Sequence, residues 1–226
     1  MATFVLVPGG WHGGWWFEPL ARRLRELGHQ AFPVTLTGVG ERSHLAAPSV
    51  NLDTHIQDVL QLLEQERLSG VVLCGHSYGG MVVSGVADRA PERVGALVYS
   101  DAYVPEDGES CSDLAGARFR QLFLDSARAD GFSVAPPPML DRQATAHPLA
   151  SVVQAIRLTG AWRQIPTREF IYLSGWSGTP FTGLYQRLAA DPEWVTHSLP
   201  VGHNIIADAF DELTEILLGA AKSLPV

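Results

Sequence analysis

Short apolar runs alternate with longer amphipathic segments along this chain. Six runs rich in β-branched or other apolar residues predict strands at residues 3–8, 30–36, 70–75, 94–100, 169–174 and 194–199. Four segments carry apolar residues at helical spacing, at residues 15–27, 52–68, 78–90 and 205–222. Several are followed by glycine or proline, where helices commonly stop. The alternation predicts the α/β class, with a doubly wound, mostly parallel six-stranded sheet linked by crossover helices.

One long region interrupts this alternation. Residues 104–165 contain no convincing strand, carry three consecutive prolines at 136–138, and include short helical pieces at 114–129 and 149–158. A long insertion between two strands is commonly a lid or a functional loop, so we expect a small helical cap after the fourth strand. With 226 residues, 46% of them hydrophobic, the chain can bury one substantial core but is short for two ordinary domains. Residues 1–226 therefore predict a single domain that carries this cap.

Charge and composition exclude several classes of function. Acidic residues outnumber basic ones 24 to 16, and no run of Lys or Arg stands out, which disfavours nucleic acid or a membrane surface as partner. The N-terminus lacks the features of a secretory signal, and no apolar stretch reaches about 18 residues, so we expect a soluble, cytoplasmic chain. Cys74 and Cys111 lie in no metal or disulfide pattern, and Cys74 is interpreted as a core residue. The oligomeric state stays open, a homodimer included.

The pentapeptide GHSYG follows a predicted strand and opens a predicted helix. A sharp turn from strand to helix strains its central residue, here Ser77, and leaves room only for the small residues Gly75 and Gly79 on either side. Such a nucleophile elbow presents the serine Oγ at the carboxyl edge of the sheet and at a helix N-terminus, where negative charge is stabilised. An ordinary tight turn is the alternative, and the pentapeptide alone does not decide between them.

A nucleophilic serine needs a base, and the base needs a third group to hold its tautomer. Of the eight histidines, only His203 follows the last predicted strand and precedes the last predicted helix. Two others, His12 and His44, lie on loops at the same sheet edge and are candidates for the pocket. The remaining histidines that we place are interpreted as structural: His29, His55, His76 and His197.

The acid should lie at the carboxyl end of a strand, between the serine and the histidine in chain order. The segment GWSGTPF after residues 169–174 has no carboxylate, while Glu169 and Asp191 precede their strands at the opposite edge. Asp101, directly after residues 94–100, is the remaining candidate. A turn or capping carboxylate is the alternative interpretation of Asp101.

The glycine-rich loop VPGGWHGGWW follows the first predicted strand and is expected to pass over the serine. Its Gly10 amide, together with the amide of Tyr78, would form an oxyanion hole. A simple turn that opens the next helix is compatible with that role.

Four stretches together carry a resemblance: FVLVPGGWHGGWW, GHSYGGMV, VYSDAYVPEDGES and LPVGHN. They resemble the α/β-hydrolase superfamily, and within it the branch of plant methyl esterases and hydroxynitrile lyases with their bacterial carboxylesterase-like relatives. The chain departs from that branch at Pro8, where a histidine is usual, and in the missing acid after residues 169–174. The lyases of the branch have a threonine and a lysine where this chain has Gly9 and Asn204, which favours hydrolysis.

The resemblance and the residues together predict a serine esterase with the triad Ser77, His203 and Asp101. Acyl transfer to and from Ser77 would cleave carboxylic esters or lactones and needs no metal or organic cofactor. Thioesters and amides stay open. Aromatic residues expected near the serine indicate a small, neutral, hydrophobic or aromatic substrate. The substrate-binding candidates are Trp11, His12, Trp162 and Trp176.

Two further functions stay open. One is lyase or carbon–carbon hydrolase chemistry on a natural product at the same site. The other is a catalytically idle, ligand-binding protein of hydrolase-like fold, which the relocated acid would suit.

Overall fold

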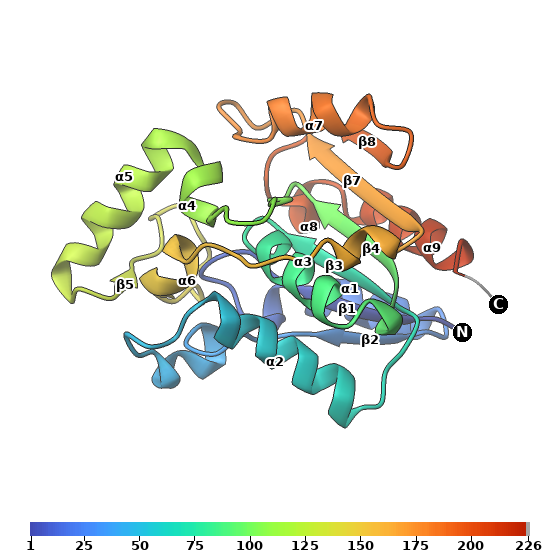
Figure 1. Cartoon of the computed structure of the whole chain (residues 1–226), viewed down its shortest axis with the longest axis horizontal. Coiled ribbons are helices and arrows are strands. Elements are labelled where there is room, and N and C mark those ends of the chain that lie inside the picture. Colours follow the sequence, from blue (N-terminus) through green and yellow to red (C-terminus); the bar gives the residue numbers. More distant parts are fainter. Residues whose placement is uncertain (225–226) are drawn as a thin grey trace.

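The sheet is the central feature of the computed structural model, which describes residues 1–224 apart from the side chain of residue 128. The last two residues of the predicted domain lie outside the described part. Six strands follow the order β2-β1-β3-β4-β7-β8, and each neighbouring pair is parallel (Figure 1). They are β1 (Thr3–Val7), β2 (Gln30–Pro33), β3 (Val71–His76), β4 (Val94–Ser100), β7 (Thr167–Leu173) and β8 (Val195–Leu199). The predicted six-stranded parallel sheet is confirmed.

Helices cover both faces of the sheet. Their bounds are α1 (Glu18–Glu26), α2 (Leu52–Gln65), α3 (Gly79–Arg89), α4 (Cys111–Leu114), α5 (Gly116–Ser126), α6 (Leu149–Val153), α7 (Thr182–Ala189), α8 (Ile205–Asp208) and α9 (Phe210–Lys222). Residues of α1 and α9 pack in one core cluster, and residues of α2 and α3 pack in the other. No helix within residues 1–224 is long and apolar enough to cross a bilayer.

The strand sequences reflect burial on both faces. In β1, Val5 and Val7 pack toward α2 and α3, whereas Phe4 and Leu6 pack toward α1 and α9. Because side chains alternate between faces, a strand covered on both sides is apolar at nearly every position. Cys74 is fully buried in the cluster formed with α1 and α9, as its place in an apolar strand predicted.

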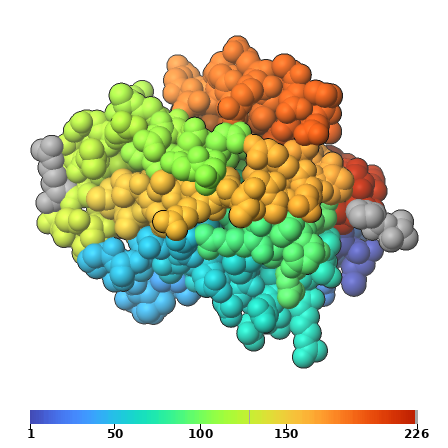
Figure 2. Space-filling model, in the orientation of Figure 1, coloured from blue at the N-terminus to red at the C-terminus, as the bar shows by residue number. Residues whose placement is uncertain are grey.

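The insertion between β4 and β7 lies at the end of the sheet toward which the strand arrows point (Figure 1). It contains α4, α5 and α6, and its atoms form a band between the N-terminal third and the region of α7 (Figure 2). The prediction that residues 104–165 contain no strand is wrong, since β5 (Ser133–Val134) pairs antiparallel with β6 (His147–Pro148). Two residues are too few to produce an alternating pattern.

Two helix predictions also need correction. The predicted helix over residues 205–222 is divided into α8 and α9 at Ala209, whose φ of −152° and ψ of 52° are not helical. Helix α7 lies between β7 and β8, where the sequence analysis predicts none. Only Leu188 of α7 is buried, so its apolar stripe is too short to be recognised by periodicity.

Candidate active site

Ser77 lies in the turn between β3 and α3 with a φ of 51°, in the left-handed region that few residues other than glycine adopt. A Cβ on Gly75 would come within 2.7 Å of the Gly79 carbonyl oxygen, and one on Gly79 within 2.5 Å of the Val7 carbonyl oxygen. Both positions therefore require glycine. The strained serine is half-buried and lies two residues before an 11-residue helix, as a nucleophile elbow requires.

The loop after β1 lies directly against the serine. A Cβ on Gly9 would be 3.1 Å from the Cβ of Ser77 and 2.9 Å from Nδ1 of His76. Within the described part of the chain, the backbone amides of Gly10 and Tyr78 donate to no protein acceptor. Two unpaired amides beside a serine are the arrangement that an oxyanion hole needs.

Asp101 and His203 meet at the same edge of the sheet. Nδ1 of His203 lies 2.6 Å from Oδ2 of Asp101, which is fully buried directly after β4. The other carboxylate oxygen, Oδ1, accepts a hydrogen bond from the Leu173 amide at 3.2 Å. Asp101 has a φ of 45°, and its own amide donates to the Ile171 carbonyl at 2.7 Å. The backbone of β7 therefore holds this carboxylate at the imidazole.

Aromatic rings pack against the imidazole of His203. The Trp176 ring stacks on the His203 ring at a centroid distance of 4.1 Å. The His76 ring also contacts the His203 ring, at a centroid distance of 4.5 Å. His76 in turn stacks on Trp16 at 4.4 Å. Trp176 belongs to the GWSGTPF segment, so an aromatic ring stands in the loop where a catalytic carboxylate was expected.

His76 supports His203 as a neutral ring. Its Nε2 donates to the His203 carbonyl oxygen at 3.0 Å, and burial lowers the pKa of His76 well below its usual range. Its Nδ1 is buried without a hydrogen-bond partner among the residues described. This placement agrees with the structural role that the sequence suggested for His76.

The four predicted substrate-binding residues have different surroundings. Trp11 and Trp176 are half-buried near Ser77 and His203, and each contacts α5: Trp11 through Phe123 at 6.4 Å, and Trp176 through Phe119 at 6.1 Å. His12 is buried within the loop after β1, where its Nδ1 donates to the Gly10 carbonyl at 2.7 Å. Burial lowers the pKa of His12, and the bond to Gly10 partly offsets this effect.

Trp162 is not brought to this site. Its amide donates to Asp88 at 3.3 Å, near the C-terminal end of α3. Asp88 lies eleven positions after Ser77, which corresponds to about 16 Å along the helix axis. The Trp162 ring is buried beside Trp194 and carries the Arg163 guanidinium 4.8 Å above it. We therefore do not propose Trp162 as a substrate contact.

Sequence patterns did not predict a buried polar cluster that lies beside Trp11 and Tyr78. His147, from β6, accepts a hydrogen bond from the Trp11 amide at its Nδ1, 3.3 Å away. The His55 ring contacts that of His147 at a centroid distance of 5.6 Å, its Nδ1 lies 2.8 Å from the Tyr78 hydroxyl, and burial lowers the pKa of His55 to about 4. The only sequence signal for His147 was Ser151 four residues later at the start of a helix.

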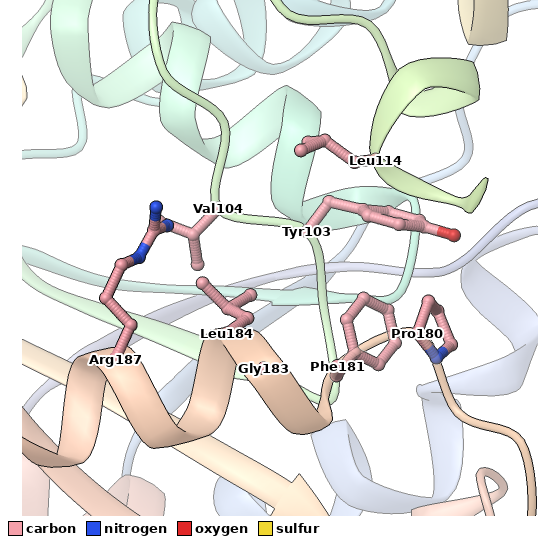
Figure 3. Close-up of a pocket in the computed structure, with 8 residues that line it drawn as sticks. All are labelled: Tyr103, Val104, Leu114, Pro180, Phe181, Gly183, Leu184 and Arg187. Carbon is pink, nitrogen blue, oxygen red and sulfur yellow. The ribbon is translucent and has the colours of Figure 1, made fainter.

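A pocket of about 240 Å³ opens between α7 and the segment after β4 (Figure 3). Its walls include Tyr103, Val104, Leu114, Phe181 and Leu184, with the exposed Arg187 beside them. The Tyr103 amide donates to the Ser77 carbonyl at 3.2 Å, and the Phe181 ring lies 6.2 Å from that of His203. The pocket is thus a neighbour of the candidate site, but its walls do not include the serine or the oxyanion loop.

A parallel sheet whose third strand ends in a strained serine turn is the arrangement of the α/β hydrolases. A model of the alpha/beta hydrolase family matches residues 4–216. The chain belongs to the alpha/beta hydrolase family.

Individual relatives indicate which kind of hydrolase the chain resembles. The chain is 38% identical over 238 residues to the carbendazim hydrolyzing esterase of Nocardioides sp. strain SG-4G, with 96% of this chain and 98% of that protein covered. It is 31% identical over 120 residues to methylesterase 10 of Arabidopsis thaliana, with 53% of this chain and 44% of that protein covered. An extracellular alpha/beta-hydrolase from a Paenibacillus species shares the fold, with a TM-score of 0.83, 22% identity, and 98% and 100% of the two chains covered. The predicted esterase branch and the class of carboxylic ester hydrolase are confirmed.

Proposed function

We propose that the chain hydrolyses neutral carboxylic esters through a triad of Ser77, His203 and Asp101. The observation that carries this proposal is the 2.6 Å contact between Nδ1 of His203 and the fully buried carboxylate of Asp101. A carboxylate at Nδ1 selects the imidazole tautomer whose Nε2 accepts a proton, which is the form that a general base needs. Ser77 lies at the same sheet edge in the strained conformation of a nucleophile.

Each step of the proposed reaction balances its protons. Ser77 Oγ attacks the ester carbonyl while its proton passes to Nε2 of His203. The amides of Gly10 and Tyr78 donate to the resulting oxyanion, and the collapse of the tetrahedral intermediate expels the alcohol, which takes the proton from Nε2. Water then attacks the acyl-enzyme, again giving a proton to His203, and the acid leaves as Ser77 recovers its proton. No external oxidant, reductant or cofactor enters this cycle.

The surroundings of His203 suit a ring that becomes positively charged during the reaction. Asp101 supplies a full negative charge at Nδ1, and the stacked Trp176 face attracts a cation by about 0.5–2 kcal/mol. His76, which also contacts the His203 ring, is held neutral by burial and adds no opposing charge. Trp176 and Asp101 together thus stabilise the imidazolium.

Two features favour hydrolysis over cyanide-releasing lyase chemistry. Asn204 follows His203 at the position where the lyases of this branch have a lysine, and its side chain is neutral. That side chain accepts from the Ala207 amide at 3.4 Å as the N-cap of α8. At Gly9, a Cβ would already crowd His76 at 2.9 Å, so a threonine hydroxyl has no room there.

The proposed substrates are neutral, hydrophobic or aromatic esters and lactones. Half-buried aromatic rings of Trp11, Trp176 and Phe119 flank the candidate site, and a net charge of −8 disfavours anionic substrates at long range. The name of the Nocardioides relative gives carbendazim as a compound to test.

Rates on two esters test this proposal. We expect kcat/KM for phenyl butyrate to exceed that for monomethyl succinate, an anionic ester, and carbendazim forms a third arm of the comparison. A Ser77→Ala variant measured in parallel controls for background hydrolysis and for contaminating esterases. A clear preference for the anionic ester would refute the substrate class, and equal rates for the variant and the wild type would refute the site.

A further inference from the structure

The β5–β6 hairpin of the insertion holds one residue of the oxyanion loop at three points. The Trp11 amide donates to Nδ1 of His147 at 3.3 Å, and the Trp11 carbonyl accepts from the Thr145 amide at 3.0 Å. The indole Nε1 of Trp11 donates to the Val134 carbonyl at 2.9 Å. These contacts join segments more than 120 positions apart in sequence.

Trp11 needs such restraint because its backbone is strained. Its φ of 69° lies in the left-handed region, which is unfavourable for a residue with a Cβ. A strained conformation persists only when the surrounding structure determines it. Trp11 directly follows Gly10, so the conformation that the hairpin imposes on Trp11 also fixes the direction of the loop that carries the Gly10 amide.

The hydrogen bonds of His147 determine its tautomer. Because an amide N–H donates to Nδ1, that nitrogen is an acceptor, and the neutral ring carries its proton on Nε2. Nε2 lies 2.9 Å from the Ser151 hydroxyl, which itself donates to the Pro148 carbonyl at 2.8 Å and so accepts from His147. The ring is 2% exposed, and burial lowers the pKa of His147 well below its usual range. Every polar atom of the imidazole therefore has a partner only in the neutral Nε2–H form.

The same ring also contacts the second proposed oxyanion residue. The His147 and Tyr78 rings meet edge to face at a centroid distance of 4.6 Å. A Cβ on Gly10 would lie 4.0 Å from Nδ1 of His147. The His147 side chain thus packs its ring against Tyr78 and accepts a hydrogen bond from the Trp11 amide. It also lies next to Gly10.

We propose that His147 is a positioning residue of the oxyanion hole, whose Nδ1 holds the Trp11 amide so that the Gly10 and Tyr78 amides converge on one oxygen. It acts through the loop and does not touch the substrate. The assignment rests on the proposed ester hydrolysis and adds a part of the insertion to that site.

Two substitutions separate the two nitrogens of the ring. In His147→Asn, the side-chain oxygen can occupy the place of Nδ1 and accept from the Trp11 amide. In His147→Gln, the amide reaches the place of Nε2 and can bond Ser151, but no acceptor is left for Trp11. Both variants carry a carboxamide, but the asparagine keeps the contact to Trp11 and the glutamine keeps the contact to Ser151.

Kinetics on phenyl butyrate and the affinity for an aryl trifluoromethyl ketone provide the readouts. The ketone forms a tetrahedral adduct with the serine, so its binding requires the oxyanion hole, whereas KM reports mainly ground-state binding. We expect His147→Gln to lower kcat by about 10- to 100-fold, less than the about 10²- to 10³-fold of deleting a donor outright, and to weaken ketone binding by a similar factor. KM should change little, and His147→Asn should recover most of the activity.

His197→Gln is the control, since His197 lies in β8, where its Nε2 contacts Glu169 at 2.8 Å, and it should retain wild-type rates. Wild-type kcat and ketone affinity in His147→Gln would overturn the proposal, as would equal losses in the Gln and Asn variants. Should His147→Gln unfold, the 15N shifts of His147 in the wild type still decide the matter, because a protonated Nδ1 at pH 7 would exclude an acceptor there. A wild type that hydrolyses no ester and forms no ketone adduct would instead refute the proposed function itself.

Discussion

Replacement of Asp101 by asparagine is the substitution whose outcome the structure defines most closely. Oδ1 of Asp101 accepts from the Leu173 amide, and Oδ2 lies 2.6 Å from Nδ1 of His203. An asparagine has a single acceptor oxygen, and the fixed amide of β7 requires it. The NH2 group must then face His203, so Nδ1 becomes an acceptor, Nε2 carries the proton, and the base is lost.

The size of the loss follows from these contacts. If His203 returned to its active tautomer, its Nδ1–H would face the NH2 group of the asparagine. Both donors would then lack an acceptor in a fully buried place, at a cost of about 1–3 kcal/mol for each. The charged hydrogen bond to the histidine, worth about 1.5–3 kcal/mol, is lost as well. These contributions sum to about 4–9 kcal/mol, and because they overlap at one contact we take the lower part of that range, about 4–6 kcal/mol, which corresponds to a kcat lowered about 10³- to 10⁴-fold. The comparable substitution in another serine enzyme lowers kcat by about 10⁴.

Steady-state hydrolysis of phenyl butyrate by Asp101→Asn and by Glu169→Gln measures this effect. Glu169→Gln is a matched control, because Glu169 pairs with His197 at 2.8 Å in the sheet and not at Ser77. Circular dichroism and urea unfolding of both variants check the fold. Activity of Asp101→Asn within tenfold of the wild type would show that another carboxylate, or none, completes the site.

Three further outcomes are expected. Trp176→Ala should lower kcat by about 3- to 30-fold because the stacked ring face over His203 is lost, and Trp176→Phe should restore most of it; a rate unchanged by alanine would contradict that stacking role. Trp162→Phe should leave kcat/KM within twofold of the wild type, and Trp162→Ala should lower the free energy of unfolding by about 3–5 kcal/mol in a urea titration. A loss of activity without a loss of stability would instead place Trp162 at the substrate. Stability should decrease as the pH falls from 6.5 to 4, since His55 has a folded-state pKa of about 4 and the unfolded chain takes up the proton first. This histidine contributes about 3 kcal/mol to that change, and urea midpoints that do not fall between pH 7 and pH 4.5 would contradict it.

Local sequence patterns were sufficient for the sheet and for Ser77. The strands are buried on both faces, so each is a nearly continuous apolar run, and Gly75 and Gly79 are required by contacts within a few residues of the turn or with the neighbouring strand. His203 and Asp101 were predicted by their order relative to the strands, which is a property of the topology. Their contact at 2.6 Å joins residues 102 positions apart in sequence.

Contacts made by the insertion were beyond the reach of sequence patterns. Trp162 and Phe119 are both aromatic residues of that region, yet one packs near the far end of α3 and the other against Trp176. The insertion has no periodic strand that would fix its register, so composition predicts an aromatic site without saying which rings form it. His147 was missed for the same reason, since a two-residue strand carries it to the oxyanion loop.

Covalent labelling with an aryl fluorophosphonate, followed by peptide mass spectrometry, tests the assignment of Ser77 most directly. The reagent phosphonylates a serine, with loss of fluoride, only when a neighbouring base and oxyanion donors activate the hydroxyl. We predict one adduct per chain on the peptide that contains Ser77, together with loss of esterase activity, and no adduct in Ser77→Ala. An unlabelled wild type, or an adduct on another serine while Ser77→Ala still hydrolyses phenyl butyrate, would contradict the proposed site.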